Sequence, residues 1–240
     1  MVRTVIFFVI FWIYQIGIFP ILLVLFARRF LGHHKAIRRI AGMVAWTWSK
    51  LLMWVAGAHL TIRGEVHLPP DQPALYVSNH QGAFDIPLAL LSIHRPAAFL
   101  SKIELVRIPS IGSWMKLIGC IFVERGNVAS AQQSLDEAVD ALKNGVSLVI
   151  FPEGTRSGSD QMKRFKAGFA RIAIRAEVPI VPIVMKGTYK LKQGDAPWIT
   201  PAAVEVAIEP PISTKGLTES DSHDLRQQVQ DVIHARLDAS

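Results

Sequence analysis

The sequence predicts an α/β protein with a mixed, largely parallel sheet of about seven strands flanked by helices, preceded by a two-helix membrane-associating segment. Two observations support this prediction. Short β-like runs alternate with helical runs after residue 57, which favours crossover units with parallel strands. Before them, residues 5–27 carry no charged side chain over a length sufficient to cross a bilayer core of ~30 Å. We therefore divide the chain into residues 1–58, the membrane-associating segment, and residues 59–240, the α/β domain.

The membrane-associating segment is expected to contain two apolar helices joined by a basic connector. Residues 28–39 form the connector and hold five arginines and lysines, while residues 40–58 contain three tryptophans that suit a bilayer interface. Basic connectors stay preferentially on the cytoplasmic side of a membrane. If the second helix is interfacial, the domain that follows is also cytoplasmic. The first helix either spans the bilayer or dips into it, and the sequence leaves both arrangements open.

Two other interpretations of the N-terminal run are weaker. A secretory signal would explain why Arg3 precedes the apolar run. However, the run is longer than a typical signal core, and no clear small-residue cleavage site follows it. A buried helical pair in a soluble core is disfavoured because the first run has no polar face.

The charge and hydropathy of the chain indicate an anionic partner. The formal net charge is +7, which fits a phosphorylated substrate, anionic lipid or nucleic acid. Because 50% of the residues are apolar, a lipid bilayer is favoured among these. Cys120 is the only cysteine, so no disulfide framework or multi-thiolate metal site is expected. The histidines stand at no metal-ligand spacing, and we expect neither a metal nor a cofactor.

The α/β domain is expected to alternate strands and helices. Strands are expected at residues 60–66, 74–78, 97–100, 120–124, 146–151, 180–185 and 204–208. Helices are expected at residues 130–144, 169–177 and 222–237, the first with a capping box formed by Ser130 and Gln133. In open α/β sheets, functional sites gather at the carboxyl ends of strands, where four polar segments follow here.

A histidine and a carboxylate follow the second expected strand. His80 and Asp85 lie five residues apart, around a glycine. Neutral imidazole is the usual general base near neutral pH, and a carboxylate can orient it and stabilise its charged form. No serine or cysteine stands in a nucleophile elbow, so this base would activate a hydroxyl of the substrate. Alternatively, Asp85 caps a helix that starts at Ile86, with Pro87 in its first turn.

Cationic side chains follow the other expected strands. Lys102, Arg125 and Arg156 each stand near a strand end, and three cations near one base predict a dianionic ligand, most simply a phosphomonoester. A further basic run at residues 163–166 is expected to contact a membrane surface. Only Phe165 lies within it, so it lacks the aromatic platform of a nucleic-acid site, and no nucleic-acid partner is expected.

Four blocks carry a resemblance to a known family: N-H-Q-G-A-F-D, I-F-V-E-R-G, F-P-E-G-T-R-S and V-P-I-V-P-I, in this order. They resemble the glycerolipid acyltransferase family, and in particular bacterial 1-acyl-sn-glycerol-3-phosphate (lysophosphatidate) acyltransferases. The resemblance covers about residues 60–185. It implies that His80 and Asp85 are the catalytic pair. It also implies a site for the substrate phosphate, which comprises Lys102, Arg125, Glu153, Gly154, Thr155 and Arg156.

The resemblance implies a membrane-bound enzyme at the cytoplasmic face of a bacterial inner membrane. It would move an acyl group from acyl-CoA or acyl carrier protein to the sn-2 hydroxyl of lysophosphatidate, giving phosphatidate for phospholipid biosynthesis. Another acceptor, such as a lysophospholipid, glycerol 3-phosphate or a lyso-aminolipid, is the first alternative. A membrane-bound lipid- or protein-binding module without catalysis is the second.

Overall fold

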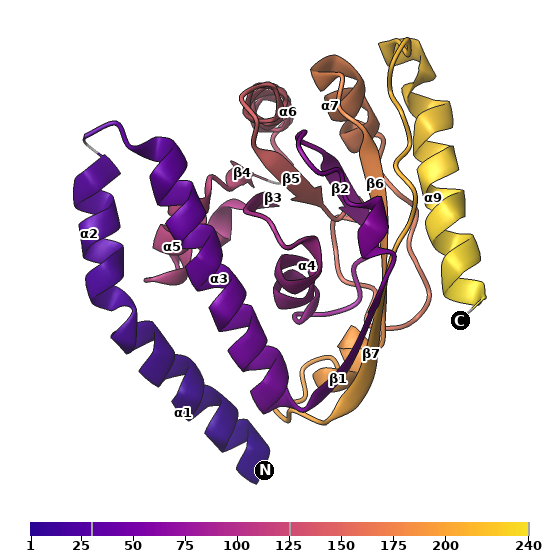
Figure 1. The fold of residues 1–240 in the computed structure, drawn as a ribbon. Helices are drawn as coiled ribbons and strands as arrows, with labels where there is room; N and C mark the ends of the chain where they lie inside the picture. The colour runs from indigo at the N-terminus through magenta and orange to yellow at the C-terminus, as the bar shows by residue number, and fades with distance from the viewer. Residues whose placement is uncertain (30, 125, 240) are drawn as a thin grey trace.

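The computed structural model describes residues 1–29, 31–124 and 126–239 of the chain. Within these ranges, seven strands form one sheet in the order β1-β7-β6-β2-β5-β3-β4 (Figure 1). The strands are β1 (Ala58–Arg63), β2 (Leu75–Ser78), β3 (Ala97–Lys102), β4 (Ile121–Val123), β5 (Ser147–Ile150), β6 (Ile180–Lys186) and β7 (Ala202–Ile208). Every neighbouring pair is parallel except β6 and β7, which are antiparallel. The predicted mixed, largely parallel sheet is confirmed.

Helices cover both faces of the sheet. On one side, α3 packs against α1, α4 and α5, while on the other α7 packs between α6 and α9 (Figure 1). The helices are α1 (Val2–Gly17), α2 (Phe19–Arg29), α3 (His34–Ala56), α4 (Asp85–Ile93), α5 (Ile111–Ile118), α6 (Val128–Lys143), α7 (Gly168–Ala176), α8 (Thr188–Leu191) and α9 (Ser222–Asp238). Short 3₁₀ turns lie at Glu65–His67, Ile103–Arg107 and Glu219–Asp221.

The start of α6 corrects one local prediction. The expected capping box of Ser130 and Gln133 is not formed, because the helix begins two residues earlier than expected. Its cap is Asn127, whose side chain accepts a hydrogen bond from the Ser130 backbone N–H at 3.1 Å. The Ser130 hydroxyl instead accepts from the backbone N–H of Glu124, which joins the end of β4 to the helix.

The N-terminal apolar run is divided into α1 and α2 where one helix was expected. Pro20 lies in the first turn of α2 and has no N–H to bond the preceding turn, so the run breaks at Ile18. Among the described helices, none is by itself long and apolar enough to cross a membrane. Helices α1 and α2 meet that criterion jointly, with a bend of 41° between them.

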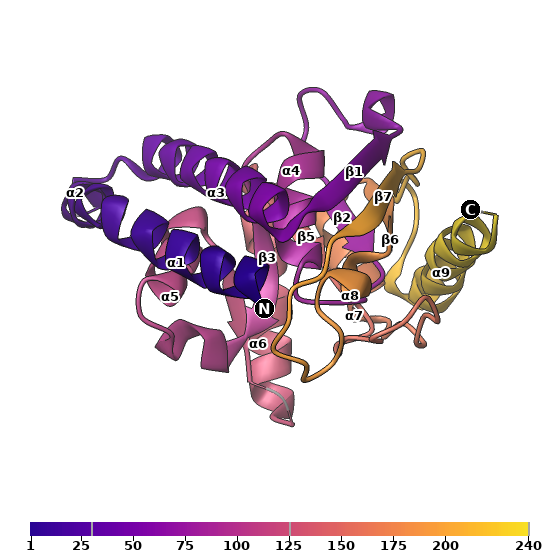
Figure 2. The same ribbon diagram turned by 90° about the horizontal axis from the view of Figure 1, so that it is seen from below.

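Helix α1 is joined to the rest of the molecule by buried polar contacts. The Thr4 hydroxyl accepts from the backbone N–H of Ile199 at 2.9 Å, and the Gln15 amide donates to the Ser110 hydroxyl at 3.1 Å. Figure 1 and Figure 2 both show α1 alongside α3. The N-terminal segment, residues 1–58, therefore packs directly on the rest of the chain.

The centre of the sheet positions the functional residues. All four residues of β2 are buried, and Asn79 extends the strand by one position through its side chain. The Asn79 amide donates to the Met185 carbonyl and accepts from the Met185 N–H, both at 2.8 Å. This pair of buried bonds holds the chain against β6 at the point where the next residue, His80, leaves the sheet.

Candidate active site

His80 and Asp85 form a hydrogen-bonded pair at the carboxyl end of β2. The His80 Nδ1 lies 2.6 Å from Asp85 Oδ2, and the backbone N–H of Gly82 donates to the same oxygen at 2.9 Å. Because an ionised carboxylate only accepts hydrogen bonds, Nδ1 carries the proton and Nε2 keeps a free lone pair. The Asp85 side chain is fully buried, whereas that of His80 is 14% exposed and lines a cavity. Nε2 of His80 is therefore open to a ligand, as a general base would require.

The helix-cap interpretation of Asp85 is wrong. Helix α4 begins at Asp85 itself, one residue earlier than that interpretation requires, and Phe84 occupies the cap position. No side-chain cap bond is present at this end of the described helix. The carboxylate instead bonds backwards to His80 and Gly82, and forward to Thr188 on another element. The Asp85 carboxylate therefore bonds the imidazole of His80 and does not cap the helix.

Aromatic stacking sets the plane of the imidazole. The His80 ring stacks on Phe151, with ring centroids 4.3 Å apart and an interplanar angle of 20°. Phe151 follows β5 and stacks in turn on Phe99 of β3 at 6.4 Å. Rings contributed by adjacent strands thus restrict the side-chain rotation of His80, in addition to the bond from Nδ1.

The loop after β5, residues 152–166, is bonded to the histidine turn along its length. The Ser157 N–H donates to the His80 carbonyl at 2.7 Å, and the Gly158 N–H donates to the Gln81 carbonyl at 3.1 Å. The Gln81 side-chain amide donates to Asp160 at 3.0 Å. These hydrogen bonds fix the position of the loop, which carries the third sequence block, relative to His80.

Glu153, one of the predicted phosphate contacts, is hydrogen-bonded to the backbone of two segments. Glu153 as a residue is 6% exposed, and its carboxylate accepts from the backbone N–H of His80 at 2.7 Å and of Lys163 at 3.0 Å. Burial raises the pKa of this carboxyl, while the two amide bonds oppose that shift. Both oxygens are occupied and a carboxylate repels a phosphate, so we infer that Glu153 positions the backbone rather than binding substrate.

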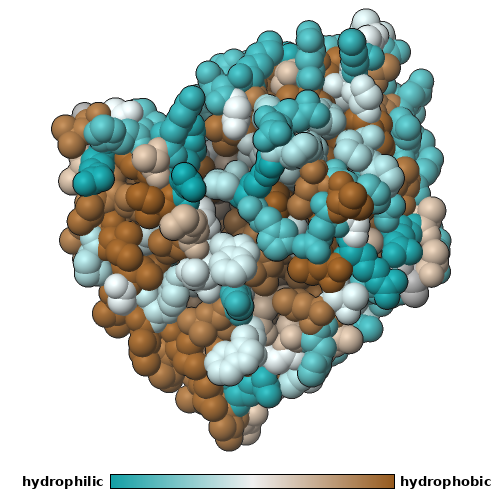
Figure 3. Space-filling view, viewed as in Figure 1, coloured by the Kyte–Doolittle hydropathy of each residue, from teal (hydrophilic) through white to brown (hydrophobic). Residues whose placement is uncertain are grey.

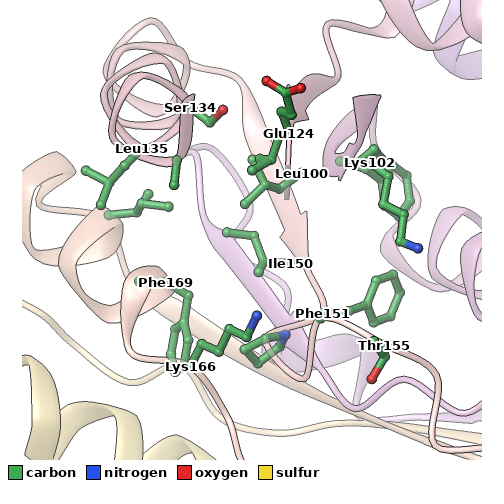
Figure 4. Close-up of a pocket in the computed structure, with 18 of the residues that line it drawn as sticks. Leu100, Lys102, Glu124, Ser134, Leu135, Ile150, Phe151, Thr155, Lys166 and Phe169 are labelled. Carbon is green, nitrogen blue, oxygen red and sulfur yellow. The ribbon is translucent and has the colours of Figure 1, made fainter. Parts of the chain in front are cut away.

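A cavity of about 850 Å³ opens beside His80 (Figure 4). It is lined by four of the six residues that the sequence assigns to phosphate binding: Lys102, Gly154, Thr155 and Arg156. Arg125, the fifth, lies outside the described residues, and Glu153, the sixth, is absent from the described lining. The structure thus brings cations from β3 and from the loop after β5 to one side of the base.

Lys166 is a lining residue that the sequence interpretation missed. It belongs to the basic run expected to contact a membrane, yet Phe165 beside it is buried and Lys163 bonds the Thr155 hydroxyl and the Arg156 carbonyl. Phe165 is thus buried while Lys166 lines the cavity. Figure 4 shows Lys102 and Lys166 on either side of Phe151.

The interior of the cavity is apolar. Side chains of the sheet face side chains of α6 and α7 across it (Figure 4). Five of these apolar residues are Leu100, Leu135, Ile150, Phe169 and Ile172. A cationic rim, a base and an apolar chamber suit an amphipathic anion that carries a reactive hydroxyl or ester. The fold and this site are those of an α/β enzyme with lipid-like ligands.

Comparisons with known proteins agree with this class. Residues 59–186 match the family Acyltransferase. A 1-acyl-sn-glycerol-3-phosphate acyltransferase from Limnanthes alba is 31% identical over 191 residues, which are 79% of this chain and 67% of that protein. The alpha enzyme of the same name from Mus musculus is 33% identical over 179 residues, 74% of this chain and 63% of the relative. The crystal structure of the 1-acyl-sn-glycerophosphate acyltransferase PlsC from Thermotoga maritima superposes with a TM-score of 0.84 at 28% identity, covering 99% of this chain and 94% of that one.

The chain belongs to the acyltransferase family. The predicted family and the predicted acyltransferase class are confirmed by these similarities, and the predicted fold class by the match with PlsC. The curated relatives extend beyond the matched region, since the chain spans about two thirds of their length.

The role inferred for Glu153 predicts that Glu153→Gln is less stable and less active. Glutamine has one acceptor oxygen, so its NH₂ group would face one of the two backbone N–H donors. We expect a loss of about 1–3 kcal/mol of unfolding free energy, together with reduced turnover because the His80 backbone shifts. Thermal unfolding and turnover of the purified protein measure both. Glu137→Gln, an exposed substitution on α6, is the matched control. Wild-type stability of Glu153→Gln would contradict the assigned role.

Proposed function

We propose that this protein transfers a fatty acyl group from a thioester donor to the sn-2 hydroxyl of 1-acyl-sn-glycerol 3-phosphate, giving phosphatidate for phospholipid biosynthesis. The observation that carries the proposal is the 2.6 Å His80–Asp85 pair at the mouth of a cavity with a cationic rim and an apolar interior. The family and the names of its relatives support the choice of substrate.

The proposed reaction begins with proton transfer to His80. Its Nε2 takes the proton of the sn-2 hydroxyl while the oxygen attacks the thioester carbonyl, and Asp85 stabilises the imidazolium that forms. The tetrahedral intermediate then expels the thiolate carrier, which takes the proton back from His80. General-base assistance of this kind contributes about 10²–10⁴-fold, and positioning of the two substrates contributes most of the remainder.

The nucleophile in this scheme is supplied by the substrate. Cys120, the only cysteine, precedes β4 and accepts from the backbone N–H of Phe99 in β3, and burial raises the pKa of its thiol to about 12. A thiol with that pKa is almost entirely protonated near neutral pH and is a poor nucleophile. A direct transfer without an acyl-enzyme is therefore the mechanism that the available groups favour.

We assign the substrate phosphate to the cationic rim. Lys102 at the end of β3 and Arg156 and Lys166 of the loop after β5 line it, and the resemblance adds Arg125, which lies outside the described residues. Gly154 has a positive φ of 72°, and a Cβ there would lie 3.2 Å from Lys166 Nζ. Glycine thus suits this backbone conformation and lets the ammonium group approach closely. Charge-assisted hydrogen bonds from these groups would hold a phosphomonoester beside the base.

The apolar chamber is assigned to a fatty acyl chain. Its lining residues come from β3, β5, α6 and α7, so a chain inside it would lie between the sheet and the helices. Acyl-CoA and acyl carrier protein present the same thioester to His80, and either is a suitable donor. The proposed reaction forms an oxygen ester, breaks a thioester and moves one proton through His80. Because no oxidation state changes and His80 handles the proton, the scheme requires no metal or redox cofactor.

We propose that α1 and α2 bring the site to a bilayer. Their outer sides expose large apolar residues, which form the hydrophobic surface at the lower left of Figure 3. These include Val5, Ile6, Phe8, Val9, Trp12, Ile13, Ile16, Phe19, Ile21, Leu23 and Val24. A contiguous exposed apolar patch of this kind marks a membrane or protein contact. With the basic connector after it, this surface suits the cytoplasmic face of a bacterial inner membrane.

Removal of the base should abolish turnover. We expect His80→Ala to lower kcat by about 10²–10⁴-fold, the usual contribution of a general base. Asp85→Asn should cause a loss of the same order, because asparagine can present its NH₂ to Nδ1 and favour the wrong tautomer. Acyl transfer to lysophosphatidate by matched detergent preparations measures both. His234→Ala, an exposed histidine on α9, is the control. Near-wild-type turnover of His80→Ala would exclude this mechanism.

Removal of a rim cation should weaken acceptor binding selectively. For Arg156→Ala we expect the KM for lysophosphatidate to rise about tenfold or more, the size of one lost hydrogen bond to a charged group. The KM for the acyl donor should change much less. Arg164→Ala, an exposed arginine of the same loop outside the described cavity lining, is the matched control. If the donor KM rose more than the acceptor KM, phosphate recognition by Arg156 would be refuted.

A further inference from the structure

The carboxylate of Asp85 has a third partner that lies far away in the sequence. Thr188 is the first residue of α8, 103 residues after Asp85, and its side chain is fully buried. Its hydroxyl bonds Asp85 Oδ1, while His80 Nδ1 and the Gly82 N–H share Oδ2. Each carboxylate oxygen thus has partners from a different part of the chain.

The hydroxyl proton of Thr188 is directed at Asp85. The Thr188 oxygen also lies 3.3 Å from the Gln81 side-chain carbonyl oxygen, but a hydroxyl has one proton to donate. The carboxylate is the nearer acceptor and carries the charge, so it receives that proton. Asp85 therefore accepts hydrogen bonds from three donors, which replace the water that burial removes.

Two glycines allow Thr188 to reach the carboxylate. Gly187 precedes α8 with φ of 86°, and a Cβ there would lie 2.4 Å from the Ala203 carbonyl oxygen of β7. A Cβ on Gly82 would lie 3.2 Å from Tyr189 Cα. The backbone of α8 consequently packs against β7 on one side and against the histidine turn on the other. Thr188 is held by the sheet, independently of α4, which carries Asp85.

This arrangement controls the rotation of the carboxylate. The torsion that turns an aspartate carboxylate is broad and has no sharp minimum of its own. With Oδ1 held by Thr188, the other oxygen, Oδ2, is kept toward the imidazole. We propose that Thr188 is a positioning residue, which orients Asp85 so that His80 presents its unprotonated Nε2 to the substrate. This inference rests on the proposed function, in which His80 is the base.

Substitutions that remove only the hydroxyl test the proposal. Thr188→Val keeps the shape of the side chain but cannot donate, and Thr188→Ser keeps the donor. We expect Thr188→Val to lower kcat about tenfold or more, with the KM for lysophosphatidate changed less than about twofold. Thr188→Ser should restore most of the kcat. Thr214→Val is the matched control, since Thr214 is a buried threonine that donates to the Val178 carbonyl away from the site.

A double-mutant cycle separates positioning from general stability. In the Asp85→Asn background, Thr188→Val should lower kcat by less than about twofold further, because its effect passes through the carboxylate. A full additional loss in that background, or a kcat within about twofold of wild type for Thr188→Val alone, would overturn the proposal. If Thr188→Val does not fold, Thr188→Ala replaces it in the comparison. Equal kcat values for Thr188→Ala and Thr188→Ser would then overturn the proposal. Activity retained by His80→Ala would instead refute the proposed function.

Discussion

The buried carboxylate of Asp85 is the group on which the rest of the site depends. An ionised carboxylate taken out of water is costly unless several donors replace the lost hydration. Here the donors are the imidazole of His80, the Gly82 backbone and the Thr188 hydroxyl, and they come from the turn after β2 and from α8 after β6. Because β2 and β6 are neighbours in the sheet, strand pairing brings these donors together. The hydrogen bonds that hold the Asp85 carboxylate therefore depend on the pairing of β2 with β6.

A second buried carboxylate, that of Glu153, links the base to the cationic rim. It accepts from the backbone N–H of His80, in the turn after β2, and from that of Lys163, in the same loop as Thr155 and Arg156. Movement of this loop would thus move the base. Such coupling favours a reaction in which the phosphate and the hydroxyl of one molecule must be placed together. It also explains why an acidic residue stands in a segment otherwise suited to binding an anion.

The strands and the His80–Asp85 pair could be predicted because both depend on local sequence patterns, whereas α4, α5 and α8 were not among the expected helices. Short β-like runs, only the first of them clearly alternating, located all seven strands, and the spacing of His80 and Asp85 places both in one turn. Thr188 and the role of Glu153 could not be predicted, since their contacts join residues 103 and 73 positions apart. Lys166 was missed because its basic neighbours suggested a membrane contact, although the apolar Phe165 beside it marked the inward side of the segment.

The central claim is that the substrate hydroxyl, activated by His80, attacks the thioester directly. Rapid-mixing measurement of thiol release from acyl-CoA, first without and then with lysophosphatidate, tests it most directly. The account predicts no burst of thiol before the acceptor is added, and continuous release afterwards. A burst of thiol equal to the enzyme concentration in the absence of acceptor would reveal an acyl-enzyme and contradict the account.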